Sequence, residues 1–150
     1  MNLSIPNNTN LVIHRQEKQS IEALYKLVYP EGREMRKPTF SVFYELIIRS
    51  DIVFTLHGIM FRMTFTDRTF PYIHAIVYSH EALRHTADIE KFLREIIYKN
   101  KYCGLQAIVP EDQKTWRKMI ERVGFKALDI IIDYFLYGQD LINGVRYILS

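Results

Sequence analysis

Residues 72–128 read YIHAIVYSHEALRHTADIEKFLREIIYKNKYCGLQAIVPEDQKTWRKMIERVGFKAL and indicate a strand, a loop, a helix, a strand and a helix. The first segment, Tyr72–Tyr78, is apolar on both faces, which predicts a strand in the middle of a sheet. Thr86 is a candidate N-cap for the first helix, and a second apolar strand follows that helix. The segment Pro110-Glu111-Asp112 predicts the start of the second helix, because acidic residues suit a first turn, and Gly124 predicts its end.

The N-terminal third of the chain predicts one short strand and two helices. Residues 1–10 are polar and rich in Asn, which predicts a loose leader, and residues 11–15 form a short apolar run typical of a strand. Ser20 is a candidate N-cap for a helix over residues 21–28. Residues 40–49 place aromatic and aliphatic side chains at spacings of three and four, so they predict a second amphipathic helix.

Two hairpins complete the pattern. Residues 52–56 and 59–65 are apolar runs separated by a short turn in which Gly58 can take a positive φ. Near the C-terminus, residues 129–137 and 144–149 form a second pair of runs around a glycine-containing turn. Both pairs therefore predict antiparallel strands.

The order of the predicted elements is β, α, α, β, β, β, α, β, α, β, β. A strand–helix–strand passage among hairpins predicts an α/β fold with a mixed, mostly antiparallel central sheet and helices on both faces. The 150 residues suit one domain, so we expect a single domain over residues 1–150 with the leader at its start.

Composition excludes several classes of protein. Hydrophobic residues make up 48% of the chain and charged residues 25%, which excludes a disordered or collagen-like chain. The net charge of +3 is mild, and basic residues alternate with acidic ones. The one basic cluster, Arg33, Arg36 and Lys37, favours a solvated loop over an anion site. Because the sequence lacks the basic stripe with interleaved aromatics that nucleic-acid binding needs, we expect no nucleic-acid partner.

The sequence also bears on location, thiol chemistry and metals. It has no signal-peptide pattern and no apolar run long enough to cross a bilayer, so we expect a cytoplasmic protein without a membrane partner. Cys103 stands in an apolar run and predicts a buried, inert thiol. His80 and His85 flank Glu81, but no second cluster has ligand spacing, so we predict no metal site.

The element order resembles that of the GNAT superfamily of acyl-CoA-dependent N-acyltransferases over residues 11–149. Ile108-Val109-Pro110, a helix and then Arg122-Val123-Gly124-Phe125-Lys126 is similar to the family's fifth strand, fourth helix and the Gly-Phe that ends it. Tyr72–Val77 is similar to the fourth strand of a phage-encoded branch. The resemblance implies a GNAT-like fold with acetyl-CoA as a possible cofactor.

In the GNAT superfamily, the fourth strand and the helix after it hold the cofactor. The end of the strand bonds the pantetheine, and a glycine-rich loop wraps the diphosphate because bare N–H groups must approach the phosphate oxygens closely. Here residues 78–88 contain no glycine, and Glu81 and Asp88 add negative charge. By resemblance, the cofactor-binding candidates in this region are Ile76, Val77, Tyr78, Arg84, His85, Thr86 and Ala87.

The fourth helix carries two further departures from the family. The family commonly has Asn, Ala and Tyr at positions that here hold Gln113, Trp116 and Ile120. Gln113 could replace Asn as a cofactor contact, whereas Trp116 could stack on a ligand, pack in the core or plug the groove. Ile120 cannot protonate a thiolate as the family's Tyr does. His74 is the candidate general base, with a buried core histidine as the alternative.

Two functions follow from the resemblance. The first is a GNAT-like protein, encoded by a phage, whose acetyl transfer has weakened or lapsed and which acts through protein contact as an accessory, virion or assembly protein. Its partners would be phage assembly proteins or further copies of the chain, in the host cytoplasm or the virion. The alternative is an active acetyl-CoA-dependent N-acetyltransferase acting on a small amine or a protein amine.

Overall fold

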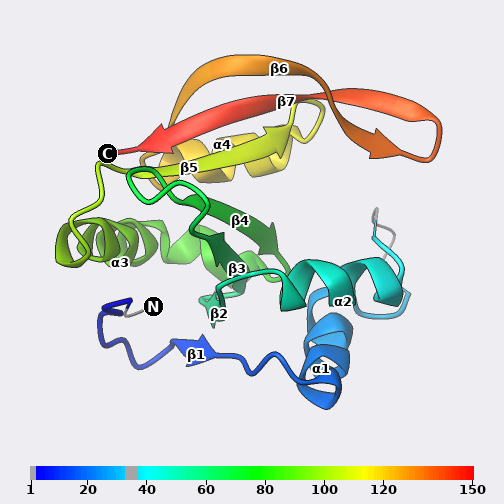
Figure 1. The fold of residues 1–150 in the computed structure, drawn as a ribbon, viewed down its shortest axis with the longest axis horizontal. Coiled ribbons are helices and arrows are strands. Elements are labelled where there is room, and N and C mark those ends of the chain that lie inside the picture. The colour runs from blue at the N-terminus through cyan, green and yellow to red at the C-terminus, as the bar shows by residue number, and fades with distance from the viewer. Residues whose placement is uncertain (1–2, 33–36) are drawn as a thin grey trace.

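The computed structural model describes residues 3–32 and 37–150, which form one seven-stranded sheet with helices packed on it (Figure 1). The strands lie in the order β1-β2-β3-β4-β5-β7-β6. The elements along the chain are β1 (Val12–Ile13), α1 (Lys18–Val28), α2 (Phe40–Ile48), β2 (Ile52–Leu56), β3 (Ile59–Thr64), β4 (Tyr72–Val77), the 3₁₀ helix η1 (His80–Arg84), α3 (Thr86–Lys99), β5 (Leu105–Pro110), α4 (Lys114–Arg122), β6 (Lys126–Tyr137) and β7 (Asp140–Leu149).

The sheet confirms the predicted fold class. Its only parallel neighbours among the described residues are β4 and β5, and all other neighbouring strands pair antiparallel. β4 is the fourth strand of the seven, as its two apolar faces predict. One buried cluster joins the sheet to α3 and α4, and a second joins its other face to α1 and α2. The helices therefore cover both faces.

The β2–β3 turn places its two residues against the end of β4. His57 has φ +49 and Gly58 has φ +81, the conformation of a two-residue hairpin turn. The Gly58 carbonyl accepts hydrogen bonds from the N–H groups of Tyr78, at 2.9 Å, and Ser79, at 3.2 Å. A Cβ on Gly58 would lie 2.6 Å from the Cβ of Ser79, so only glycine permits this approach.

Helix starts are where the sequence predictions fail most. α1 begins at Lys18 with Glu17 at its N-cap, so Ser20 lies inside the helix and does not cap it. α3 has His85 at its N-cap, so Thr86 is the first helical residue. α4 begins at Lys114, and the acidic residues before it are not in its first turn. The cause is that β5 continues to Pro110, after which Glu111 donates from its N–H to the Asn143 carbonyl at 2.8 Å.

The sequence prediction for Cys103 needs correction, and the leader makes contacts that its composition does not predict. Cys103 is exposed, because β5 begins only at Leu105 and the thiol precedes the buried part of the run. Residues 3–10 have no helix or strand, yet they are held against α3: the Ser4 N–H donates to Asn100 at 2.8 Å, and the Asn8 side chain donates to Asp88 at 3.1 Å.

The last hairpin is longer than the sequence predicts. β7 begins at Asp140, four residues earlier than predicted, so the last hairpin is long and reaches past β5 (Figure 1). Of the predicted basic cluster, Arg33 and Arg36 lie outside the described residues. No helix in the described chain is both long and apolar enough to cross a membrane.

Candidate functional site

A cavity of about 870 Å³ opens where β4 and β5 separate. Within the described chain these strands pair at one position, Tyr72 opposite Gln106, and then diverge. Gln106 fixes that point, because its N–H donates to the Pro71 carbonyl at 3.0 Å and its side-chain amide donates to the Phe70 carbonyl at 2.8 Å. β4 stays paired with β3 and β5 with β7, so the gap between the two strands is built into the sheet.

Several elements close around this gap. Its walls come from β4 and β5, from α2 on one face of the sheet, and from α3 and α4 on the other. The distal part of the β6–β7 hairpin, residues 134–138, covers the remaining side. Most of the lining is aliphatic or aromatic, so the cavity suits a ligand with a large apolar part.

His74 and Arg62 supply charge and hydrogen-bonding groups to the cavity. They lie directly opposite each other on β4 and β3, and both line the cavity. Burial, and secondarily the nearby Arg62 guanidinium, lowers the pKa of His74 to about 4. His74 is therefore neutral at pH 7 and a weak proton acceptor. Its ring also stacks on Tyr72, with 6.4 Å between the ring centroids.

The predicted cofactor residues on β4 separate into two groups. Ile76 and Val77 line the cavity, close to the diverging edge of the strand. Tyr78 packs on the other face of the sheet against the α1–α2 cluster, and its hydroxyl is hydrogen-bonded to Thr55. The strand therefore directs only part of the predicted set toward the gap.

The predicted diphosphate residues lie away from the cavity. Arg84 ends η1, His85 is the N-cap of α3, and Thr86 and Ala87 begin that helix. None of the four lines the cavity, whereas Ile89, one turn further along α3, does. The 3₁₀ helix η1 thus lies where the resemblance implies a glycine-rich loop.

In α4, Trp116 and Ile120 both line the cavity and pack against the core beneath it. Trp116 therefore narrows the gap without filling it. Gln113 is the N-cap of α4 and is not part of the lining. At Ile120 the wall offers no proton donor, and the phenol of Tyr29, elsewhere in the lining, has its pKa raised to about 12, chiefly by burial.

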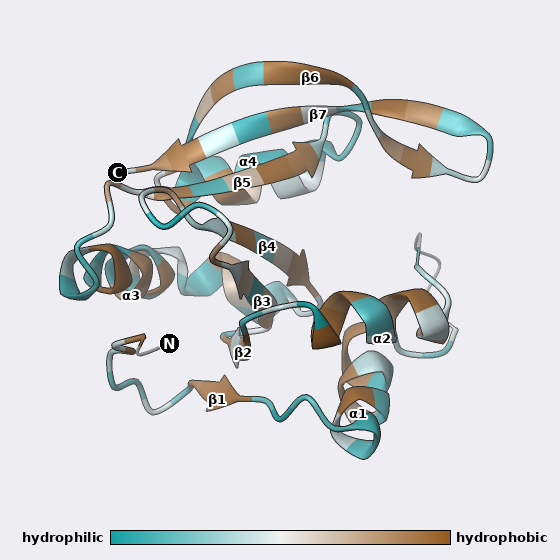
Figure 2. Cartoon of the chain, viewed as in Figure 1, coloured by the Kyte–Doolittle hydropathy of each residue, from teal (hydrophilic) through white to brown (hydrophobic). Residues whose placement is uncertain are grey.

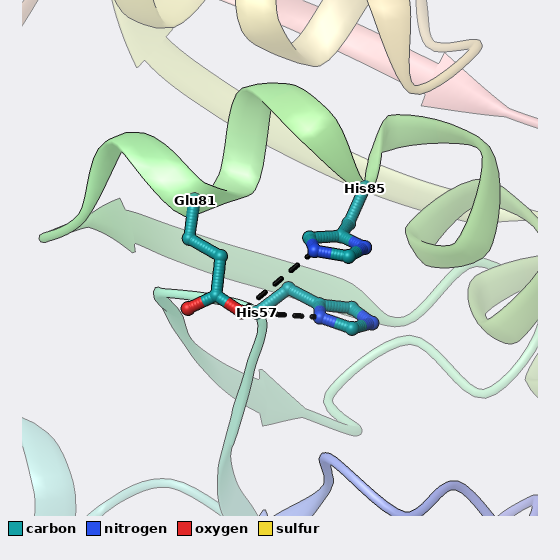
Figure 3. A group of neighbouring side chains, drawn as sticks. All are labelled: His57, Glu81 and His85. Atoms are coloured by element: carbon teal, nitrogen blue, oxygen red, sulfur yellow. Dashed lines mark ion pairs between the residues drawn. The ribbon is translucent and has the colours of Figure 1, made fainter.

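A second group of polar residues lies at the start of α3 (Figure 3). Glu81 Oε1 lies 4.0 Å from His57 Nδ1 and 3.7 Å from His85 Nε2, and the two imidazole rings stack with centroids 4.0 Å apart. His57 Nε2 is hydrogen-bonded to Asp88. Hydrogen bonds from Asn8, and then from His57, lower the pKa of the Asp88 carboxyl.

Sequence reasoning did not place His57 in this group. The turn itself is predicted, but its neighbours follow only from the pairing of β3 with β4, which sets Ile59 opposite Val77. That antiparallel register brings residues 57–58 beside residues 78–79, and so beside η1. The sequence signal that could have located His57 was the predicted antiparallel pairing of residues 59–65 with residues 72–78, which places the turn before the first strand beside the loop after the second.

A mixed sheet whose two parallel strands splay apart, with helices on both faces, is the fold of the GNAT N-acetyltransferases. Solved structures with this fold include a mutant of spermidine N-acetyltransferase SpeG from Vibrio cholerae, which is 12% identical with a TM-score of 0.63 over 95% of this chain and 94% of that one.

Two further solved structures share the fold. An N-acetyltransferase from Staphylococcus aureus Mu50 is 13% identical with a TM-score of 0.67, over 92% of this chain and 96% of that one. The protein smu.2055 from Streptococcus mutans UA159 is 10% identical with a TM-score of 0.66, over 93% and 98% of the two chains. No family model matches the sequence, and no curated protein sequence matches it. At these identities the likeness concerns the fold alone.

Proposed function

We propose that this chain is a GNAT-fold protein in which acetyl transfer has lapsed and whose present role is contact with protein through the edge strand β6. The observation that carries the proposal is an exposed apolar row on that strand. Two features of the cavity region support the loss of chemistry.

The first feature is that the two positions expected from the resemblance to transfer protons, residues 74 and 120, are unsuited to that task. A base that removes the proton of an attacking amine works best with a pKa near the working pH, and the pKa of His74 is about 4. The position that the family gives to a tyrosine acid is Ile120, whose side chain faces the same cavity. Neither proton-transfer step is served by the residues that the resemblance predicts.

The second feature is the charge at the start of α3. The N-terminus of a helix attracts anions because its first N–H groups are unpaired. Here Asp88 lies in the first turn and is held by His57, and Glu81 lies next to the same histidine. A diphosphate at this position would meet two carboxylates.

The apolar row lies on the outer strand of the sheet, where Figure 2 shows hydrophobic residues along much of β6. Its members, together with the residue opposite Leu136 on β7, are between 45% and 76% exposed: Leu128, Ile130, Ile132, Tyr134, Leu136 and Leu141. A contiguous group of exposed apolar residues of this kind is typical of a protein-interaction surface.

The occupant we propose for this surface is a second copy of the chain. The row lies on an edge strand whose pairing with β7 is interrupted between residues 127 and 129 and between residues 131 and 135. A two-fold axis beside β6 would set the row of one copy antiparallel to the same row of the other. Such an interface would bring the apolar side chains of the two rows into contact. An accessory, virion or assembly role in a phage is the finer form of this proposal, and it rests on the sequence resemblance of β4.

The oligomeric state in solution tests the protein-contact part. We expect sedimentation velocity to give a dimer for the native chain and a monomer for Ile132→Lys. Tyr98→Lys, which changes a strongly exposed large residue on α3, is the control and should stay dimeric. A native chain that remains monomeric up to the highest concentration at which it stays soluble would contradict the proposal.

An active acetyl-CoA-dependent N-acetyltransferase is the second candidate function, and the open cavity between β4 and β5 favours it. In this form a bound small amine or protein amine attacks the thioester directly, and His74 or a water chain takes the proton. Because a structural neighbour is a spermidine N-acetyltransferase, spermidine is a reasonable first amine to test. Release of free CoA that depends on added amine would support this candidate over the first.

A further inference from the structure

We propose that His57, Glu81 and His85 form a binding site for one transition-metal ion of the Zn²⁺ type, with Asp88 orienting His57. The site belongs to the β2–β3 turn and the β4–α3 connection. None of its residues lines the cavity, so the proposal does not depend on whether the chain transfers acetyl groups.

The three ligand atoms already lie close together. His57 Nδ1, Glu81 Oε1 and His85 Nε2 are all within 4.8 Å of one another. Tetrahedral Zn²⁺ with bonds of about 2.1 Å separates its ligand atoms by about 3.4 Å. The side chain of His57 is 3% exposed, whereas those of His85 and Glu81 are 39% and 54% exposed. Because an imidazole nitrogen binds a metal in the plane of its ring, His85 would turn out of its stack on His57, and the partial exposure of His85 and Glu81 leaves room for that movement.

The buried nitrogen of His57 is the observation that points to a ligand. Among the described residues, Nδ1 is the one buried side-chain nitrogen or oxygen without a hydrogen-bond partner. It faces Glu81, and the stacked His85 ring presents its own nitrogen to the same carboxylate (Figure 3). An unpartnered buried polar atom is costly, and a metal ion at this point would satisfy it.

Asp88 gives His57 the arrangement of a metal-binding histidine. A histidine that binds a metal through one ring nitrogen usually donates the other N–H to a carboxylate, which fixes its tautomer and orientation. Here Nε2 donates to Asp88, which leaves a lone pair on Nδ1. Asn8 donates a second hydrogen bond to the same carboxylate and holds it in place.

The ligand set selects the class of metal. Two imidazole nitrogens and one carboxylate oxygen suit Zn²⁺, Co²⁺ or Ni²⁺, whereas Mg²⁺ and Ca²⁺ prefer oxygen ligands alone. With two of the ligands partly exposed, the fourth position is open to water. A bound ion would also join the β2–β3 turn to η1.

The other explanation of the cluster is a network of contacts from His57 to Asp88 and Glu81 without any metal. Both explanations use the same contacts, so only metal titration separates them. If the cluster is purely an ion-pair network, added Zn²⁺ should find no stoichiometric site in it.

The test is calorimetric titration of the full chain, without a polyhistidine tag, with ZnCl₂ after dialysis against chelator. We expect one ion per chain, a higher melting temperature with Zn²⁺, and with Co²⁺ the visible absorption of a tetrahedral site. His85→Ala and Glu81→Gln change partly exposed side chains, so both should fold, and each should weaken binding by at least about tenfold.

His80→Ala is the matched control, since His80 lies on the same 3₁₀ helix outside the three-residue group. It should bind Zn²⁺ as the native chain does. The proposal is overturned if the native chain shows no saturable one-to-one binding, or if His85→Ala binds as tightly as His80→Ala.

Discussion

Arg62 and His74 lie directly opposite each other on β3 and β4, and both face the cavity between the splayed strands. Their proximity matters because burial and the guanidinium charge both disfavour a proton on the imidazole, and the pKa of His74 is about 4. In a transferase this residue would have to accept a proton at neutral pH. The position of Arg62 opposite His74 therefore makes His74 a weaker base in the cavity.

Removing the guanidinium should raise the pKa of His74 only in part. Burial is the larger cause of the lowered value and Arg62 the smaller one, so in Arg62→Met we expect the pKa to rise from about 4 yet stay below the ordinary value of 6.5. Histidine NMR titration measures this directly. A native His74 that titrates near 6.5 would contradict the environment described for it.

His74 should also make the fold less stable in acid. Its folded pKa lies below its unfolded pKa, so the unfolded chain binds the extra proton more readily, and stability falls as the pH drops from 6.5 to about 4. The full effect is on the order of 3 kcal/mol. In His74→Gln, the free energy of unfolding in urea should fall less steeply between pH 6.5 and about 4 than it does in the native chain. His14, whose pKa burial also lowers, should retain its own smaller contribution.

Gly58 and Gly138 form a matched pair for the β2–β3 turn. Both have positive φ, +81 and +63, but a Cβ meets Ser79 at Gly58 and meets nothing within 4 Å at Gly138. Gly138→Ala should cost about 1 kcal/mol for the backbone conformation. Gly58→Ala should cost about 2 kcal/mol more through the clash. Equal losses in the free energy of unfolding for the two variants, measured with urea, would mean that a Cβ at residue 58 does not clash with Ser79.

Trp116→Ala should loosen the fold and enlarge the cavity. Because the indole is partly buried against the core, we expect a loss of about 2 kcal/mol in the free energy of unfolding. If Trp116 blocks a cofactor, the variant should also bind acetyl-CoA more tightly than the native chain. Lowered stability with unchanged binding would assign it to packing alone.

Much of the fold follows from local patterns in the sequence. The apolar faces of Tyr72–Tyr78 place β4 in mid-sheet, and Gly58 and Gly124 mark a turn and a helix end that the structure confirms with positive φ. The start of α4 was missed because tertiary pairing overrides local preference. At Pro110 and Glu111, continued contact with β7 delays α4 despite a favourable acidic start.

The site is less predictable than the fold. Ile76, Val77 and Trp116 do line the cavity, since their strand and helix positions carry over from the resemblance. Local sequence patterns predict neither that the β6–β7 hairpin lines the cavity nor that His57 lies beside Glu81 and His85. Both depend on strand register and on how far the last hairpin extends beyond β5.

The most direct test of the central claim, that acetyl transfer has lapsed, is calorimetric titration of the native chain with acetyl-CoA to millimolar concentration. Even a weak site should release or absorb heat and raise the melting temperature by mass action. We predict no saturable binding. One-to-one binding in the micromolar range, with amine-dependent release of CoA, would contradict the account and establish an active acetyltransferase.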